Sequence, residues 1–235
     1  MNEAQEKPTE FDLYAGEYDD LIRDPIREKF AASNRFFAER KLQVIHRFYG
    51  NRNTDTRALN WLDVGCGQGD LLKMGKSRFA SVAGCDPSAG MLRSCSGLEV
   101  RLQTSAELLP FDDGSFDFIT AVCVYHHVPV EQRETLCREA FRLLRRGGVF
   151  CLIEHNPLNP VTRLIVSRTP VDANAQLLTA GSSRRLMTRS GGRILKTRYF
   201  LLFPEQIYKR LARVEDWMEA VPLAGQYAVF AERAN

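Results

Sequence analysis

The sequence predicts an α/β fold built on a doubly wound, mainly parallel sheet of seven strands. Three observations indicate this class. Short apolar runs alternate with helical patterns from Ala58 onward, at the spacing of successive strand–helix units. One apolar run ends in an acid and is followed by glycines at positions 65, 67 and 69, where a strand must turn sharply into a helix. The 235 residues, 44% hydrophobic and 26% charged, suit one large globular domain or one domain with a cap.

An amphipathic helix is expected before the alternating region. Phe30, Phe37 and Val44 recur at intervals of seven, and Pro25 is typical of a first helical turn. We therefore predict a single helix that begins at Pro25 and ends at Gly50. This helix lies outside the alternating pattern, which indicates a cap or lid.

The alternating region supplies the sheet domain. Its clearest helix has Leu136, Ala140 and Leu143 on one face and is stopped by the Gly147-Gly148 pair. The strands are expected at 58–64, 81–85, 98–103, 116–124, 149–153, 193–203 and 226–232. The helices are expected at 70–78, 89–95, 131–144, 161–166 and 179–190. The last two strands, joined by a long connection, suit an antiparallel pair at one edge of the sheet.

These elements predict three parts along the chain. Residues 1–10 are polar and lack the apolar core of a signal peptide, so we expect a flexible tail. Residues 11–50 are expected to form a helical lid, and residues 55–235 the ligand-binding domain. Within that domain, the segment 156–178 has two Pro-flanked turns and a short helical pattern, which indicates an insertion beside the ligand site.

Composition and charge argue against several function classes. The net charge of +3 is too small to indicate a nucleic-acid partner or a membrane surface, and no stretch approaches the ~18 apolar residues of a membrane span. The six cysteines form no CxxC pair, so we expect reduced, buried thiols with no disulfide and no metal site. The segment 173–204 holds six basic residues and no acid, and we interpret it as a solvated face. We expect a cytoplasmic monomer or homodimer.

The glycine turn carries the strongest functional signal. In a doubly wound sheet, ligands bind beyond the carboxyl ends of the strands, where this turn lies. The dinucleotide fingerprint is G-x-G-x-x-G, whereas here Gly69 arrives one residue early. Asp86 stands 21 residues after Gly65, where a carboxylate can accept hydrogen bonds from both hydroxyls of a ribose. The alternative is an ordinary turn before a helix, with Asp86 as a helix cap.

The motifs together resemble the class I S-adenosylmethionine (SAM)-dependent methyltransferases. Leu-Asp-Val-Gly-Cys-Gly-Gln-Gly at 62–69 is similar to the glycine-rich first motif of that family, and Gly-Cys-Asp-Pro-Ser-Ala-Gly-Met-Leu at 84–92 is similar to its acidic ribose loop. The segments 106–111, 115–119 and 144–148 are similar to those around the fourth strand and before the fifth. The resemblance covers about residues 55–155. It is nearest to the branch typified by ubiquinone and menaquinone biosynthesis methyltransferases.

The resemblance implies a Rossmann-like methyltransferase fold, SAM as cofactor and S-adenosylhomocysteine (SAH) as product. Ser105 stands where this branch usually has an aspartate that holds the adenine amino group, so that contact falls to its hydroxyl or to the backbone at Ala106. The implied cofactor-binding residues are Tyr18 in the lid, Asp63, Gly65, Cys66, Gly67, Asp86, Pro87, Met91, Ser105, Ala106, Glu107 and Val122.

Three of the four histidines fall at the carboxyl ends of predicted strands, while His46 lies in the N-terminal helix and is expected to be structural. Methyl transfer needs a general base only if the acceptor is a hydroxyl, phenol or protonated amine, and histidine suits that role. We predict His155 as the first candidate and His126 as the second. His127 falls where the family branch commonly has a structural histidine.

The insertion is expected to shape the acceptor pocket. Leu164, Ile165 and Val166 are candidates for an apolar lining, with Arg163 and Arg168 to meet an acidic group. The alternative is an ordinary packing helix with solvated arginines.

The predicted function is therefore SAM-dependent methyl transfer to a small-molecule acceptor, at an oxygen. Two alternatives stay open. An NAD-dependent oxidoreductase is disfavoured by the glycine spacing and by the lack of a Tyr-x-x-x-Lys pair. A catalytically inert SAM-binding module would keep the cofactor seat and lack the acceptor chemistry.

Overall fold

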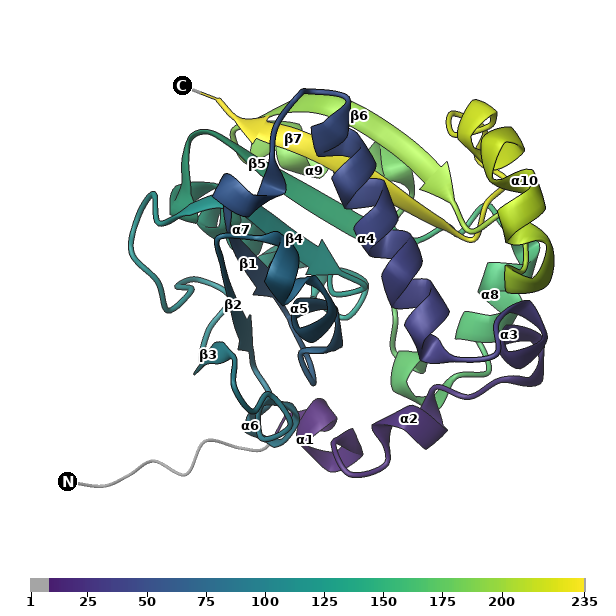
Figure 1. Cartoon of the computed structure of the whole chain (residues 1–235). Helices are drawn as coiled ribbons and strands as arrows, with labels where there is room; N and C mark the ends of the chain where they lie inside the picture. The colour runs from purple at the N-terminus through teal and green to yellow at the C-terminus, as the bar shows by residue number, and fades with distance from the viewer. Residues whose placement is uncertain (1–8, 235) are drawn as a thin grey trace.

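The computed structural model describes residues 9–234 and confirms the predicted fold class. Within these residues, seven strands form one sheet in the order β3-β2-β1-β4-β5-β7-β6 (Figure 1). Strands β1 to β5 pair in parallel, and β7 runs antiparallel to both β5 and β6. The strands are β1 (Asn60–Val64), β2 (Ser81–Asp86), β3 (Glu99–Leu102), β4 (Phe116–Val122), β5 (Leu144–His155), β6 (Gly192–Phe200) and β7 (Gln226–Arg233). The strand order reverses between β1 and β4, which places the ligand-binding crevice at their carboxyl ends.

Helices cover both faces of the sheet. Figure 1 shows α4 and α5 over one face and α7 and α9 over the other, while α1, α2 and α3 run along the carboxyl-end edge. The α-helices are α1 (Glu10–Tyr14), α2 (Tyr18–Leu21), α3 (Pro25–Phe30), α4 (Asn34–Gly50), α5 (Asp70–Gly75), α6 (Ala89–Leu92), α7 (Val130–Leu143), α8 (Pro160–Val166), α9 (Ala180–Arg189) and α10 (Glu205–Trp217). The 3-10 turns are η1 (Thr56–Ala58), η2 (Lys76–Arg78) and η3 (Pro170–Asp172).

The core consists of one apolar layer on each face of the sheet. On the α7 and α9 side, Leu136, Phe141 and Met187 pack against strand residues with almost no exposed surface. On the α4 and α5 side, Phe48 stacks on Phe230 of β7 with the ring centroids 4.0 Å apart. Burial of such side chains is the main favourable term in folding, at about 25 cal/mol per Å² of apolar surface.

The helix predicted from Pro25 to Gly50 is divided in the structure, so that prediction is wrong. Ala31 adopts an extended conformation (φ −148°, ψ 141°) that ends α3, and α4 begins only at Asn34. The two helices also differ in position. The apolar stripe of α4 packs on the sheet as part of the core, because Phe36, Leu42, Val44, Ile45, Phe48 and Tyr49 are buried there. We therefore restrict the lid hypothesis to α1, α2 and α3.

The predicted connection over 204–225 contains α10, which sequence reasoning missed. This helix is anchored by a buried ion pair between Arg40 of α4 and Glu215, whose side chains are 3% and 1% exposed. The second Glu215 oxygen accepts the backbone N–H of Leu202 at 2.8 Å. The ends of most other elements differ from prediction by a few residues. Strand β5 begins earlier than expected, and its register with β4 jumps from Leu144 to Val149 across an irregularity.

The predicted tail at 1–10 lies mostly outside the described residues. Residues 9 and 10 are described and differ from a tail, because Thr9 caps α1, which begins at Glu10. The cap is a capping box in which Thr9 and Asp12 bond to each other's backbone. Among residues 9–234, no helix combines the length and apolarity needed to cross a bilayer.

Candidate active site

The glycine turn after β1 adopts backbone conformations that glycine favours. Gly65, Gly67 and Gly69 have φ values of +71°, +53° and +75°. A Cβ on Gly65 would lie 2.4 Å from a methyl carbon of Val124, so a side chain has no room there. A Cβ on Gly67 would meet nothing within 4 Å, so the backbone there borders open space. The turn therefore combines close packing against the segment after β4 with a backbone edge, bare of side chains, that a ligand can approach.

Asp86 is joined directly to this turn. Its Oδ2 accepts the backbone N–H of Gly67 at 2.8 Å, and its Oδ1 accepts that of Ser88 at 2.9 Å. The register of the parallel pair explains the contact. Val64 lies opposite Cys85, so the glycine turn begins beside Asp86, the last residue of β2. Burial raises the pKa of the Asp86 carboxyl, and the two N–H donors partly oppose that shift. Each oxygen keeps a further lone pair for a hydroxyl donor.

A cavity of about 690 Å³ opens above the turn and contains most of the predicted cofactor residues. The lining includes Tyr18, Gly65, Gly67, Asp86, Pro87, Met91, Ser105, Ala106, Glu107 and Val122. We call this space the cofactor cleft. Sequence reasoning missed further lining residues that carry no motif, among them Phe11, Lys41, Gln103, Cys123 and Gln132.

Two of the predicted cofactor residues, Asp63 and Cys66, do not line this cleft. Asp63 is 3% exposed, and its Oδ1 accepts the hydroxyl of Thr120 at 2.5 Å, which in turn accepts the indole N–H of Trp61 at 2.8 Å. Burial raises the pKa of Asp63 to about 7. Cys66 is buried against Gly84. Both side chains lie in the core beneath the glycine turn.

Ser105 lines the cleft, but its hydroxyl is engaged locally. The Oγ atom accepts the backbone N–H of Glu107 at 2.8 Å, and the Ser105 carbonyl accepts from the side chain of Gln103 at 3.2 Å. The hydroxyl therefore shapes the loop after β3 and keeps its proton available as a donor.

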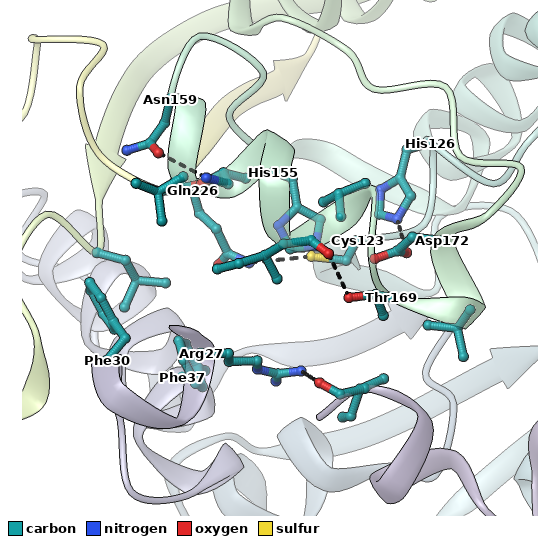
Figure 2. A pocket seen from close by; sticks show the side chains of 18 of the residues that line it. Arg27, Phe30, Phe37, Cys123, His126, His155, Asn159, Thr169, Asp172 and Gln226 are labelled. Atoms are coloured by element: carbon teal, nitrogen blue, oxygen red, sulfur yellow. Dashed lines mark hydrogen bonds and ion pairs between the residues drawn. The ribbon is translucent and has the colours of Figure 1, made fainter. Parts of the chain in front are cut away.

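A second cavity of about 350 Å³ adjoins the cofactor cleft, and we call it the acceptor cavity (Figure 2). Both spaces are lined by Tyr18, Lys41, Cys123 and His127, which form a common wall. Most of the remaining lining is apolar and comes from α3, α4, α8, η3 and the loop after β6. It includes Phe30, Phe37, Val161, Ile165, Val166, Val171, Leu201 and Leu202. Figure 2 shows Arg27, His126, His155, Asp172 and Gln226 as labelled polar members.

The basic residues of the acceptor cavity are not those expected from the insertion. Ile165 and Val166 line the cavity as predicted, whereas Leu164 is 46% exposed and lies outside the lining. Arg163 is exposed, and Arg168 lies 3.6 Å from a carboxylate oxygen of Asp24. Arg27 of α3 and Lys41 of α4 supply the cationic groups instead. No local motif marks these two residues, since the tertiary fold brings them to the site.

Four side chains form a hydrogen-bonded and ion-paired group at one end of the acceptor cavity. The Nδ1 of His126 lies 2.5 Å from Glu154 Oε2, and its Nε2 lies 3.4 Å from Asp172 Oδ1. The same Asp172 oxygen is 3.4 Å from His127 Nε2. Glu154 also accepts the backbone N–H of Tyr125 at 2.7 Å. Sequence reasoning named His126 and overlooked Glu154 and Asp172.

Electrostatics separate the two predicted catalytic histidines. Burial opposes the charged form of His126, but the Glu154 and Asp172 carboxylates outweigh that effect and raise its pKa to about 9. Burial, reinforced by the neighbouring His126, lowers the pKa of His155 to about 3. The rings of His126 and His155 lie 5.3 Å apart between centroids. The two pKa shifts run in opposite directions, so the ring of His126 is more readily protonated than that of His155.

The common wall includes a strained residue. Cys123 has φ +57°, which is unusual for a residue other than glycine, and its Sγ accepts a hydrogen bond from the Gln226 side chain at 3.5 Å. The Gln226 side-chain oxygen is buried and has no partner among residues 9–234. Leu201, with φ +66°, lines the same cavity. Strain and unpaired polar atoms of this kind concentrate at functional sites.

Helix α1 lies against α6 beside the cofactor cleft. Asp12 Oδ1 accepts the Ser88 hydroxyl at 2.7 Å and the Gly90 N–H at 2.8 Å. The Gly90 N–H is the strongest influence on the Asp12 carboxyl and helps to lower its pKa to about 2. Phe11 contacts the His127 ring edge-to-face at 5.0 Å between centroids. The carboxylate of Asp12 thus ties the N-terminal segment to the loop after β2 and to α6.

Comparisons with known proteins point to the same family. Residues 62–152 match the family described as a methyltransferase domain. The tRNA (carboxymethyluridine(34)-5-O)-methyltransferase alkbh8 of Xenopus tropicalis is 35% identical over 88 residues, 37% of this chain and 14% of that protein. A demethylmenaquinone methyltransferase of Symbiobacterium thermophilum is 30% identical over 170 residues, 67% of this chain and 64% of that protein. The chain thus spans less than two thirds of the length of either relative.

The likeness extends to a solved structure. A SAM-dependent methyltransferase from Archaeoglobus fulgidus superposes with a TM-score of 0.61 at 17% identity, covering 85% of this chain and 100% of that one. At this identity the likeness concerns the fold alone. The strand order, the glycine turn joined to Asp86 and the matched sequence agree, and the chain belongs to the class I SAM-dependent methyltransferase family.

Proposed function

We propose that the protein transfers the methyl group of SAM to an oxygen of a small molecule that combines an apolar body with an anionic group. The observation that carries this proposal is the common wall of Tyr18, Lys41, Cys123 and His127, which separates the cofactor cleft from the acceptor cavity. A methyl donor on one side and an acceptor on the other would meet there. The intact acceptor cavity favours an enzyme over an inert SAM-binding module.

The residues of the cleft fit this cofactor. Asp86 has lone pairs free for ribose hydroxyls, and the bare backbone at Gly67 suits close approach of a small polar ligand. Bound SAM would supply an electrophilic methyl group and leave as SAH. The transfer requires the acceptor atom to be held in line with the bond between sulfur and the methyl carbon. Positioning is therefore the main task that falls to the side chains of this chain.

Arg27 and Lys41 support an anionic acceptor. The Arg27 guanidinium donates to the carbonyl of Ile22 at 2.9 Å and lies over the ring of Phe37 at 4.8 Å. Burial lowers its pKa, and neither Arg27 nor Lys41 forms an ion pair within residues 9–234. A cation withdrawn from water is costly unless it is paired, so a carboxylate or phosphate on the acceptor would stabilise the complex.

We keep His155 as the candidate catalytic residue in an orienting role, because its lowered pKa makes it too weak a base for the role that the sequence predicted. His126, held between Glu154 and Asp172, is kept as a residue that positions the site. His155 ends β5 and faces the acceptor cavity, where a ring nitrogen can hydrogen-bond to an acceptor hydroxyl and orient it. We expect His155→Ala to lower turnover more than it lowers the affinity for SAH. Turnover equal to that of the wild type would remove His155 from the mechanism.

An RNA acceptor, suggested by the name of one relative, is less well supported. Of the six basic residues between 173 and 204, three are already paired with acids in the structure. These are Arg193 with Glu232, Lys196 with Glu219, and Arg198 with Asp216. Charges paired in this way contribute little to phosphate binding.

The helices α1, α2 and α3 are proposed to act as a lid over the cleft. Phe11 and Tyr18 of this segment line the cleft, and Asp12 ties it to the loop after β2. Closing such a segment over the cofactor would exclude water from the common wall.

Two measurements test the proposed function. SAH at ~100 times its Kd should stabilise the protein by roughly 2.7 kcal/mol, whereas NAD should not. SAM with a labelled methyl group is incubated with the protein and, in parallel, with a small-molecule extract or with total RNA. The small-molecule extract should yield a labelled anionic product that Asp86→Ala forms far more slowly, and the RNA should stay unlabelled. Asp70→Ala, an exposed acid at the start of α5, serves as the control. Stabilisation by NAD alone, or label recovered only in RNA, would refute the proposal.

A further inference from the structure

We propose that His126, His127 and Asp172 bind a divalent transition-metal ion at the end of the acceptor cavity. One ligand atom from each of these residues, two imidazole nitrogens and a carboxylate oxygen, lies within 4.8 Å of the other two. All three residues line the acceptor cavity. The sequence shows no metal-ligand spacing here, because two ligands are adjacent after β4 and the third follows 45 residues later in η3.

The separations suit one ion bound by all three residues. Asp172 Oδ1 lies 3.4 Å from the Nε2 atoms of both His126 and His127. Ligand atoms at about 2.1 Å from a tetrahedral ion are separated from one another by about 3.4 Å. Three protein ligands would leave one position open, and all three residues line the cavity that an acceptor would occupy. This is the arrangement of metal sites that act on a bound molecule rather than sites that only stabilise a fold.

A second observation points to a missing ligand. His126 is 1% exposed, and its Nε2 has no hydrogen-bond partner among residues 9–234. That atom faces Asp172, as the dashed line in Figure 2 shows. A buried imidazole nitrogen without a partner is unfavourable, and coordination to a metal would satisfy it.

Glu154 supports the proposed metal ligand His126 from the side of the ring away from the cavity. It is fully buried, and its Oε2 lies 2.5 Å from His126 Nδ1, the ring nitrogen opposite the proposed ligand atom. A carboxylate on the far nitrogen of a metal-bound histidine fixes the tautomer and orients the ring. The group also places two carboxylates, Glu154 and Asp172, around His126, and a divalent cation compensates two negative charges.

The donor set selects the class of metal. Two imidazoles and one carboxylate favour zinc, iron or cobalt over magnesium or calcium, which prefer oxygen ligands. An ion in this place would present a Lewis acid to an oxygen of the acceptor. The site is separate from the cofactor cleft except through His127, so metal and SAH binding can be measured independently.

The test begins with the full-length wild-type protein stripped by a chelator. Calorimetric titration with Zn²⁺, repeated with Co²⁺ as a spectroscopic probe, should show one saturable site per chain. The Co²⁺ spectrum should indicate nitrogen and oxygen ligands and lack the thiolate charge-transfer band that cysteine would give. The absence of saturable binding of either ion, or a thiolate band, would overturn the proposal.

Variants locate the site. Asp172→Asn and His127→Ala should abolish the saturable binding, and Glu154→Gln, which alters no ligand, should weaken it by roughly 10- to 100-fold. Cys123→Ser, in the same cavity wall, should retain wild-type metal affinity. Circular dichroism checks that each variant is folded, and SAH affinity is a further check for Asp172→Asn and Glu154→Gln, whose residues do not line the cofactor cleft. Binding that survives Asp172→Asn and His127→Ala, or that is lost in Cys123→Ser, would contradict the assignment even if methyl transfer is intact.

Discussion

The attachment of α1 through Asp12 gives the sharpest test of the proposed lid. Asp12→Ala removes the acceptor of the two hydrogen bonds that join α1 to the α6 segment, from the Ser88 hydroxyl at 2.7 Å and the Gly90 N–H at 2.8 Å. It also removes the Thr9 contact of the capping box, whose effect stays within α1. Hydrogen bonds to a charged group contribute about 1.5–3 kcal/mol each when buried. Asp12 is partly exposed, so we expect about 2 kcal/mol for the pair. That corresponds to roughly 30-fold in the equilibrium between docked and undocked α1.

The expected consequence is a weaker complex with SAH. If the docked state binds the cofactor, its affinity falls with the docked population, by up to roughly 30-fold in Asp12→Ala. Asp12→Asn keeps an oxygen acceptor without the negative charge, so its SAH affinity should lie between those of the wild type and Asp12→Ala. Calorimetry measures the affinity, and hydrogen exchange of the α1 amides measures docking. Asp20→Ala, an exposed acid of α2 with its side chain 81% exposed, should behave as the wild type.

The same contact predicts a pH dependence. The pKa of Asp12 is about 2 in the folded protein against 3.8 for an unperturbed carboxyl. Because the folded pKa is the lower one, the docking contribution is fully present above about pH 4 and is lost as the pH falls toward 2. SAH affinity in Asp12→Ala within twofold of the wild type, together with unchanged exchange of α1, would refute the lid hypothesis.

Substitution of three further residues, two of them in charged contacts and one in a tightly packed turn, should change kinetics or stability in a predictable way. Arg27→Gln should raise the KM for an anionic acceptor by roughly 10- to 100-fold with SAH affinity unchanged, as steady-state kinetics would show. Glu215→Ala leaves the buried Arg40 unpaired and should lower the free energy of unfolding by about 3–5 kcal/mol in urea titrations. Gly65→Ala should cost about 2–5 kcal/mol of stability, because φ is +71° and the new Cβ meets Val124 at 2.4 Å.

Matched variants separate these effects from general damage. Arg23→Gln, an exposed neighbour on the same segment, should leave the acceptor KM unchanged. Glu39→Ala breaks an exposed pair with Arg35 and should cost less than about 1 kcal/mol. Gly67→Ala shares the positive φ but meets no atom within 4 Å, so its stability loss should be the smaller of the two glycine variants. An equal rise in KM for the two arginine variants, or an equal loss of stability within the glutamate or the glycine pair, would contradict the physical cause given for that pair.

The sequence predicts those features that depend on residues close together along the chain. The strands, the glycine turn and its acid at Asp86 are determined by alternation, positive φ and β–α spacing, and each was predicted before the structure. Helix α10 was missed although Pro204 and Glu205 are typical of a helix start, because its only buried residue is the charged Glu215. An apolar stripe predicts a helix but not its partner, which is why α4 was expected in a lid and lies in the core.

The polar residues of the acceptor cavity could not be predicted from local sequence patterns. Arg27, Lys41 and Asp172 line one cavity only because α3, α4 and η3 converge on it, and Glu154 of β5 is buried behind His126. Their importance lies in burial and pairing, which are tertiary properties. His126 was a candidate by its place at a strand end, but its two carboxylate neighbours became visible only in the fold.

The central claim is that acceptor and cofactor occupy two adjoining cavities, and blocking one of them tests it most directly. Ile165 of α8 lines the acceptor cavity and does not line the cofactor cleft. Ile165→Trp adds bulk to a space of about 350 Å³, so transfer of labelled methyl from SAM should fall by at least roughly 100-fold while SAH affinity stays within twofold of the wild type. Methyl transfer at the wild-type rate, or loss of SAH binding in the folded variant, would contradict the two-cavity arrangement.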